Sequence, residues 1–247
     1  MKTKKTLLLF LVMAIVSPVH SQYWKHLKQY SAGVVLGANL TDIRLSDESY
    51  NIYSHQWTPH PILGAFFQYR SEDGYSFRPE LFYFGRGGGL TCRDVSYRLS
   101  THCLDMRLGM RIDYVVPRSF FTIYGVATPE LTFIMGGNVE YTSKNTGALK
   151  MPLSRNNMGI VDLGVFAGLG MEFPIFFNRN AIYISGEAGY HINITNSFTS
   201  NEASGDIDIL NIINMPPPAL GSRVSGSFEV TVRVGIPFGN KIRIKRL

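Results

Sequence analysis

Apolar and polar residues alternate without interruption along Leu104–Tyr114, which reads LDMRLGMRIDY. Successive side chains of a β-strand point to opposite faces, so this segment would carry one apolar face and one face of aspartate, arginine and glycine. In a helix both sets would be scattered around the axis. Charges of both signs opposite a continuous apolar face are typical of a strand with lipid on one side and a polar lumen on the other. The stretch therefore predicts a membrane-spanning strand of a β-barrel.

The same period-two pattern recurs along the chain and predicts eight strands in all. The predicted strands lie near Ala32–Leu40, Pro61–Arg70, Tyr75–Phe84, Leu104–Tyr114, Phe121–Met135, Ile160–Phe173, Ala181–Ile194 and Ser227–Phe238. The fourth of them could begin as early as Val95, and a bulge is expected at Pro79, which has no ladder donor.

The connections between the predicted strands alternate in length. They are short after the second, fourth and sixth strands, and long after the first, third, fifth and seventh, at residues 41–60, 85–94, 138–157 and 196–225. Outer-membrane barrels alternate in this way between periplasmic turns and extracellular loops. We therefore expect an all-β fold, an eight-stranded antiparallel transmembrane β-barrel of the outer-membrane type, with both termini in the periplasm. A barrel of eight strands has an interior that side chains fill.

The first residues have the features of a secretory signal peptide. Lys2, Lys4 and Lys5 precede the apolar run Leu7–Val16, and small or tolerated residues end at Ser21. We expect a signal peptide at 1–21, a periplasmic N-terminal segment at 22–31, the outer-membrane barrel at 32–238 and a basic periplasmic tail at 239–247. No apolar run reaches the roughly 18–20 residues that a helical span requires.

Composition narrows the chemistry further. Three lysines of the signal peptide account for half of the formal net charge of +6, so the mature chain carries only +3 and nucleic-acid binding gains no support. The only cysteines, Cys92 and Cys103, are eleven positions apart within one predicted hairpin, and we predict a disulfide between them. No CxxC or HExxH motif is present, and we expect no metal and no cofactor.

With these strands assigned, the chain resembles the PorT-like outer-membrane β-barrel family of Bacteroidota. The segments that carry the resemblance are GVVLGANL (33–40), YSFRPELFYFGRGG (75–88), CLDMRLGMRIDY (103–114) and GLGMEFP (168–174). The resemblance implies an outer-membrane location and, for the namesake of the family, an accessory role in secretion through the type IX system. The chain departs from the family's common β-signal because it ends in the tail 239–247 and not in an aromatic residue.

Charged residues on the predicted inward face could form a carboxylate-rich active site or a structural ion-pair network. We favour the network, because charges in a narrow lumen must pair with one another to offset desolvation. Its predicted members are Arg78, Glu80, Asp105, Arg107, Arg111, Asp113, Glu130, Asp162, Glu172, Glu187, Glu229 and Arg233.

His191, Ser185 and Glu187 share one face of a predicted strand and so invite a hydrolase interpretation. Outer-membrane lipid A deacylases use these residue types, but they must meet the lipid on the outer surface of the barrel. Strand parity places these three side chains in the lumen, which argues against catalysis.

The segment Ile207–Met215 is unusually apolar for a solvent-exposed loop, and it either folds over the barrel mouth or offers a docking surface. We expect the first. Lys241, Arg243, Lys245 and Arg246 could contact anionic head groups or a periplasmic partner, or could be a solvated basic end.

The sequence thus predicts a non-enzymatic outer-membrane protein with a structural or accessory role in the cell envelope. The expected partners are outer-membrane lipid and an envelope or secretion-system protein. The alternatives are a narrow porin, an outer-membrane lipid-modifying enzyme and a soluble lipocalin-like binder, in which the two strand faces would be exchanged.

Overall fold

The computed structural model describes residues 27–43, 54–92, 95–116, 119–143, 147–152, 161–177, 180–195 and 225–242. The predicted signal peptide, the apolar segment 207–215 and the tail beyond residue 242 lie outside the described residues. Among the residues described, no helix is both long enough and apolar enough to span a membrane.

The described chain is built from antiparallel strands. Their bounds are β1 (Lys28–Ile43), β2 (Ser54–Gln56), β3 (Thr58–Arg70), β4 (Tyr75–Cys92), β5 (Val95–Val115), β6 (Thr122–Ser143), β7 (Gly147–Pro152), β8 (Val161–Phe177), β9 (Asn180–Asn193) and β10 (Ser225–Lys241).

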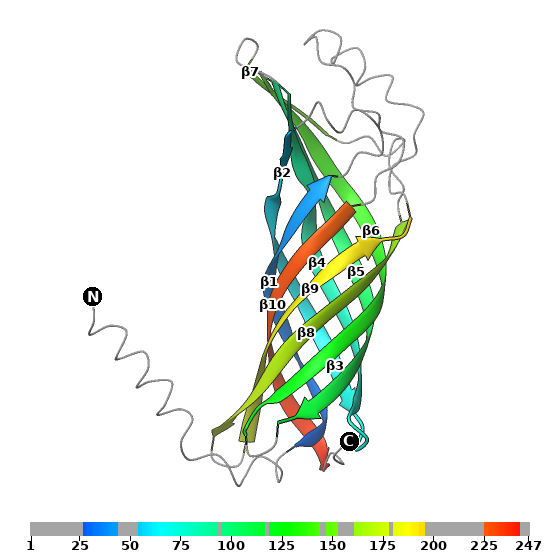
Figure 1. Cartoon of the computed structure of the whole chain (residues 1–247), viewed down its shortest axis with the longest axis vertical. Helices are drawn as coiled ribbons and strands as arrows, with labels where there is room; N and C mark the ends of the chain where they lie inside the picture. The colour runs from blue at the N-terminus through cyan, green and yellow to red at the C-terminus, as the bar shows by residue number, and fades with distance from the viewer. Residues whose placement is uncertain are drawn as a thin grey trace, which may run out of the picture.

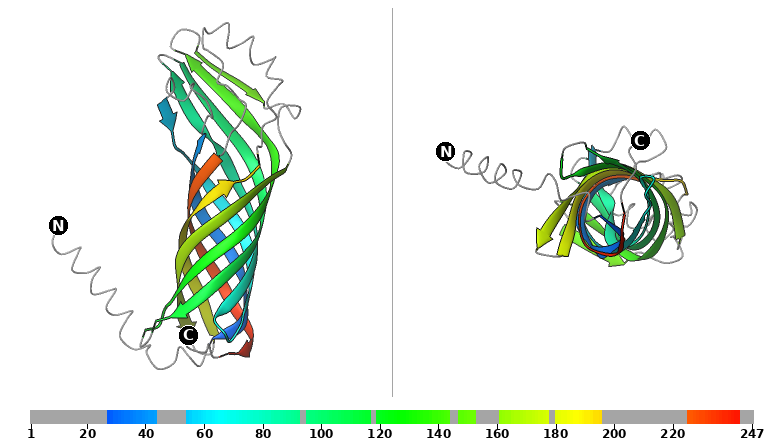
Figure 2. Two further views of the ribbon diagram at one scale, coloured as in Figure 1. Left: turned by 45° about the vertical axis from the view of Figure 1, so that its right-hand side comes forward. Right: turned by 90° about the horizontal axis from the view of Figure 1, so that it is seen from below.

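Eight of these strands close into a barrel, as the end-on view in Figure 2 shows. The pairing follows chain order through β1, β3, β4, β5, β6, β8 and β9 to β10. A register from Lys28↔Lys241 to Ile43↔Ser225 then joins β1 to β10, so within the part of the chain described no barrel strand is left as an edge. The predicted eight-stranded barrel is confirmed.

Strands β4, β5 and β6 continue beyond the rim of the barrel as a sheet on one side (Figure 1). The short strand β2 pairs with β4, and β7 pairs with β6. We call this sheet, formed by β2, residues 85–92, 95–102 and 136–143, and β7, the extension. It lies at the end of the barrel opposite to the start of β1 and the end of β10, where Lys28 pairs with Lys241.

Three predicted loops are wrong in part. In the first, residues 41–43 still belong to β1, and β2 and the start of β3 lie within 54–60. Residues 85–92 form strand, because β4 pairs with β5 without a break from Tyr75↔Ile112 to Cys92↔Val95. Residues 138–143 extend β6, and β7 interrupts the rest of that predicted loop. Glycine and polar residues favour loops in isolation, but cross-strand pairing decides the conformation here.

The register also corrects two local predictions. Pro79 causes no bulge, because it pairs with Leu108 in the unbroken register of β4 and β5. A register shift occurs elsewhere, between His102 and Cys103 where β5 pairs with β6. The first strand begins at Lys28, inside the segment that we predicted to precede the barrel.

The predicted disulfide is not compatible with the hairpin register. Cys103 lies opposite Phe84, whereas Cys92 lies opposite Val95. Eight positions at about 3.3 Å each separate the two by roughly 26 Å, and a disulfide requires Cα atoms within about 7 Å. Cys103 is a free, buried thiol.

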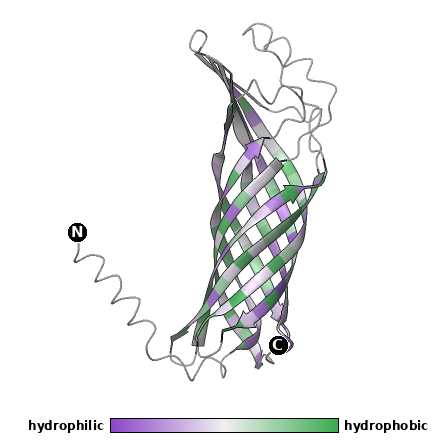
Figure 3. Cartoon of the chain, viewed as in Figure 1, coloured by the Kyte–Doolittle hydropathy of each residue, from purple (hydrophilic) through white to green (hydrophobic). Residues whose placement is uncertain are grey.

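The barrel has an apolar outer surface and a polar interior, which appears in Figure 3 as alternating colours along each strand. On β5, Met110 is 56% exposed while Arg111 is 1% exposed. This is the parity predicted from the alternation, and it excludes the exchanged faces of a lipocalin-like binder.

Apolar side chains close the barrel floor, at the end where β1 begins and β10 ends. Leu27, Tyr183 and Ile242 form a buried cluster, and Val115, Phe176 and Ala181 pack against it. The Ile242 amide donates to the Leu27 carbonyl at 3.0 Å, and the Lys28 amide donates to the Tyr183 hydroxyl at 3.0 Å. These two hydrogen bonds join the start of β1 to the end of β10 and to β9 at the floor of the barrel.

Candidate functional site

All twelve predicted network residues are buried in the lumen, where they come from six of the eight barrel strands. The structure adds Arg70, Arg86 and His191 to them. These side chains form three groups along the barrel axis, which we call the lower, middle and upper layers, counted from the floor.

The lower layer contains Arg70, Arg111, Asp113 and Glu172. Arg70 Nη2 lies 2.6 Å from Glu172 Oε1, and Arg111 Nη1 lies 2.8 Å from Glu172 Oε2. Asp113 contacts both arginines, with 3.5 Å between its Oδ2 and Arg70 Nε. Ser76 donates a hydrogen bond of 2.5 Å to Asp113. The layer joins β3, β5 and β8 across the lumen.

The middle layer is a closed ring of two arginines and two glutamates. Arg78 lies 2.6 Å from Glu187 Oε2 and 3.1 Å from Glu80 Oε1. Arg233 contacts the same two carboxylates, at 2.7 Å from Glu80 and 2.9 Å from Glu187. Each charge therefore has two partners of opposite sign, from β4, β9 and β10.

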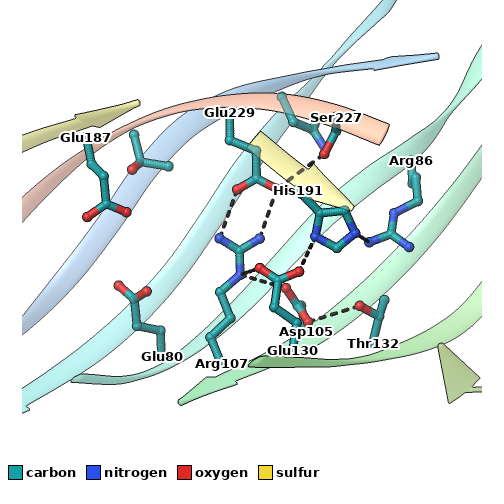
Figure 4. A network of polar contacts seen from close by, with 12 residues as sticks. Glu80, Arg86, Asp105, Arg107, Glu130, Thr132, Glu187, His191, Ser227 and Glu229 are labelled. Carbon is teal, nitrogen blue, oxygen red and sulfur yellow. Dashed lines mark hydrogen bonds and ion pairs between the residues drawn. The ribbon is translucent and has the colours of Figure 1, made fainter. Parts of the chain in front are cut away.

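Arg107 is the centre of the upper layer (Figure 4). Its two terminal nitrogens donate to Glu229 at 2.9 Å each, a bidentate arrangement. Its Nε lies 2.7 Å from Glu130 and 2.8 Å from Asp105. Three carboxylates from β5, β6 and β10 thus depend on one guanidinium group.

Two aromatic rings enclose that guanidinium group. The Arg107 Cζ atom lies 4.5 Å from the ring centroid of Phe82 and 4.9 Å from that of Phe166. Cation–π contacts strengthen when the cation is withdrawn from water, as it is here.

His191 connects Glu130, a partner of Arg107, to a second arginine, Arg86 (Figure 4). His191 Nδ1 contacts Glu130, and His191 Nε2 lies 3.0 Å from Arg86 Nη2. Arg86 Nη1 donates to Asp162 at 2.9 Å, and the Thr195 hydroxyl donates to Asp162 at 2.5 Å. The upper layer is therefore one continuous polar network.

The layers differ in charge. The lower and middle layers each pair two arginines with two carboxylates, whereas the upper layer pairs Arg86 and Arg107 with four carboxylates, counted over the described residues. The upper-layer carboxylates are Asp105, Glu130, Asp162 and Glu229. His191, against Glu130, is the remaining group in this layer that could carry positive charge.

The lumen is packed as well as paired. A Cβ atom on Gly170 would lie 2.3 Å from Tyr124 Cζ, so the Tyr124 ring occupies the space that a side chain at 170 would need. Arg111 stacks on the same ring, with 3.6 Å between its Cζ and the ring centroid. The inward glycine at 170 thus makes room for a large side chain in the lumen.

Arg86 and Arg70 were absent from the predicted network for different reasons. Arg86 lies among glycines that suggested a loop, so its inward parity was not considered. Arg70 ends a predicted strand and shares the inward parity of Gln68, which was the signal that could have included it.

The histidine, serine and glutamate considered for hydrolysis do not meet. Ser185 is six positions from His191 along β9, about 20 Å at 3.3 Å per residue. Glu187 belongs to the middle layer, and His191 to the upper one. Across the described ranges, no group of three or more histidine, cysteine or acidic side chains is placed to hold a metal ion.

A family profile described as outer membrane protein beta-barrel domain matches residues 21–199, more than half of the chain. The chain belongs to this family. This membership places the protein among outer-membrane β-barrels. The family match does not distinguish the PorT-like group within it.

Solved structures with a similar arrangement are small outer-membrane barrels of low sequence identity. OprG from Pseudomonas aeruginosa is 12% identical and covers 87% of this chain and 96% of its own, with a TM-score of 0.44. Neisserial surface protein A is 12% identical over 83% of this chain and 96% of its own, with a TM-score of 0.37. Ail of Yersinia pestis is 7% identical over 84% and 99%, with a TM-score of 0.35. Comparison with curated proteins gives no match.

Proposed function

We propose that this barrel is a sealed, non-enzymatic membrane anchor with a structural or accessory role in the cell envelope. The observation that carries the proposal is the filled lumen, in which three layers of ion pairs join strands on opposite sides of the barrel. A pore needs mobile water where these side chains pair. The apolar floor around Leu27 and Ile242 gives a second barrier.

Purified, folded protein is expected to show negligible conductance in planar lipid bilayers, because an eight-stranded barrel encloses only enough space for its own side chains. A variant that opens the middle layer, Arg78→Ser with Glu187→Ser, is the matched comparison. Steady, reproducible channels from the unaltered protein would favour the narrow-porin alternative instead.

We further propose that the extension faces the exterior and both termini face the periplasm, as the alternation of long and short connections supports. In a background without Cys92 and Cys103, a cysteine at Lys150 of β7 is expected to react with a membrane-impermeant maleimide on intact cells. A cysteine at Asp73, in a short turn, is expected to react only after permeabilisation. Labelling in the opposite order would reverse the topology.

The accessory role that we propose is association with a secretion system, as the resemblance to PorT-like barrels suggests. Deleting the gene is then expected to lower the amount of exported protein in the medium while the permeability of the envelope stays unchanged. Quantitative analysis of culture supernatants, with the wild-type gene restored as the control, tests this role. Unchanged export would leave only the structural role.

A further inference from the structure

The hydropathy pattern of β5 reverses at His102. From Leu104 to Tyr114 the outward side chains are apolar, but the next outward positions towards the extension are His102, Ser100 and Arg98. The inward positions change in the opposite sense. Below His102 they are mostly charged, whereas above it the apolar side chains of Tyr97 and Leu99 are buried. The outer face of a barrel is apolar only where it meets hydrocarbon, so the membrane surface crosses β5 near His102.

The neighbouring strand β4 carries glycine at each outward position beside this polar row. Gly85 lies opposite His102, and Gly89 lies opposite Arg98. Pairing between β3 and β4 ends at Ile62↔Phe84, just below this level. The β4 backbone therefore carries no side chain of its own next to His102 and Arg98, and Gln56 of β2 lies over Gly89.

His60 of β3 packs over Gly85. A Cβ atom at position 85 would lie 2.6 Å from His60 Nδ1, so only glycine admits the ring there. His60 is 9% exposed, and its Nε2 has no hydrogen-bond partner among the described residues. Arg98 and His102 lie close enough to the His60 ring to act on it electrostatically. Because His60 Nε2 is enclosed by protein atoms, a ligand on the outer surface does not reach it.

Tyr83 orients His102 on the same outer face. The Tyr83 hydroxyl lies 3.1 Å from His102 Nδ1, and the two rings stack with their centroids 6.1 Å apart. When the phenol donates to Nδ1, the proton of the neutral imidazole resides on Nε2, which then serves as a donor. This outward-facing histidine bonds to a tyrosine and not to a serine.

Arg98 carries a permanent positive charge and several N–H donors, and His102 offers a second donor when its Nε2 carries the proton. One carboxylate is near: Glu140 lies opposite Arg98 on β6, and Lys150 lies opposite Glu140 on β7. Arg98, Glu140 and Lys150 thus alternate in sign across this row and leave it with one net positive charge. Donors and positive charge together suit an anion that offers several acceptor oxygens.

We propose that His102 and Arg98, beside the buried ring of His60, bind the phosphate of a lipid head group in the leaflet on the side of the extension. In the topology proposed above, on which this assignment of leaflet rests, that is the outer leaflet. The apolar surface below His102, which includes Leu81 and Met106, would contact the acyl chains. The site lies where lipid phosphates lie, at the boundary between the apolar and polar parts of the outer surface.

The experiment measures binding of a bis-phosphorylated lipid A to the full-length chain in zwitterionic detergent micelles, by native mass spectrometry. The same lipid without its phosphates is the second probe, and inorganic phosphate is added as a competitor. We expect the phosphorylated lipid to bind at least tenfold more tightly. Arg98→Gln and His102→Ala should each weaken its binding about tenfold or more, the loss expected for one charge-assisted hydrogen bond.

Lys150→Gln is the matched control, because it removes one exposed positive charge from the same sheet outside the proposed site. Equal weakening by Lys150→Gln and Arg98→Gln, or equal binding of the two lipids, would overturn the proposal. Displacement of the lipid by inorganic phosphate at low concentration would assign the site to a free anion instead of a lipid. All three variants are exposed, and the heat-dependent gel shift of a folded barrel reports whether each has folded. Failure of the sealed-barrel function would appear in the conductance measurement and not in this one.

Discussion

Replacing Arg107 with leucine is expected to cause the largest loss of stability of any single lumen substitution. Arg107 contacts three carboxylates, Asp105, Glu130 and Glu229, and all three are buried. Removing one partner of a buried ion pair costs about 3–5 kcal/mol, because the remaining charge stays desolvated. Such a loss approaches the total stability of many proteins, about 5–15 kcal/mol. The urea midpoint of refolded protein and its heat-dependent gel shift measure the effect.

Two controls separate lost charge from lost packing. Arg107→Met keeps an unbranched stem between Phe82 and Phe166, so it should destabilise nearly as much as leucine if unpaired acids are the cause. Adding Glu229→Gln to Arg107→Leu should restore part of the stability, because one unpaired charge is removed. Arg98 is on the same strand but exposed, so Arg98→Leu should change the free energy of unfolding by no more than about 0.5 kcal/mol. Full stability of Arg107→Leu would show that the network does not brace the barrel.

The number of strands and their lipid-facing sides could be predicted from the sequence because both depend on local alternation. Each side chain on β5 from Leu104 to Tyr114 faces the side that period two assigns to it. Strand ends could not be predicted in the same way. The glycines from Gly85 to Gly89 have low strand propensity, and only their pairing with residues 98–102 makes them part of β4.

Parity identified twelve members of the lumen network, but it did not predict most of the pairings between them. Contacts between positions two apart on one strand, such as Arg111 with Asp113, are implied by the sequence alone. Arg107 and Glu229 are separated by 122 positions, and their meeting depends on barrel closure and on the stagger of the strands. The outer site around His60 was missed because it needs β3 to part from β4, which no local pattern encodes.

Met110→Arg is expected to impair insertion and folding, whereas Met110→Leu should be nearly neutral. Met110 faces outward between Phe77 of β4 and Ala127 of β6, and it lies within the apolar part of β5. A cationic residue on the lipid face near the bilayer midplane costs about 2–4 kcal/mol. The urea midpoint of protein refolded into lipid vesicles measures that cost.

The neighbouring residue supplies the matched comparison for this second large effect. Arg111→Leu should also destabilise, but for the reason that Asp113 and Glu172 lose a buried partner. Adding Glu172→Gln should therefore rescue Arg111→Leu in part and should do nothing for Met110→Arg. The thickness of the bilayer also distinguishes Met110→Arg from Arg111→Leu. A thinner bilayer brings position 110 nearer to water and so lowers the cost of an arginine there. The lumen, and therefore the effect of Arg111→Leu, should not change. If Met110→Arg folds as well as the unaltered protein and Met110→Leu does not, then lipid contacts the opposite face of β5.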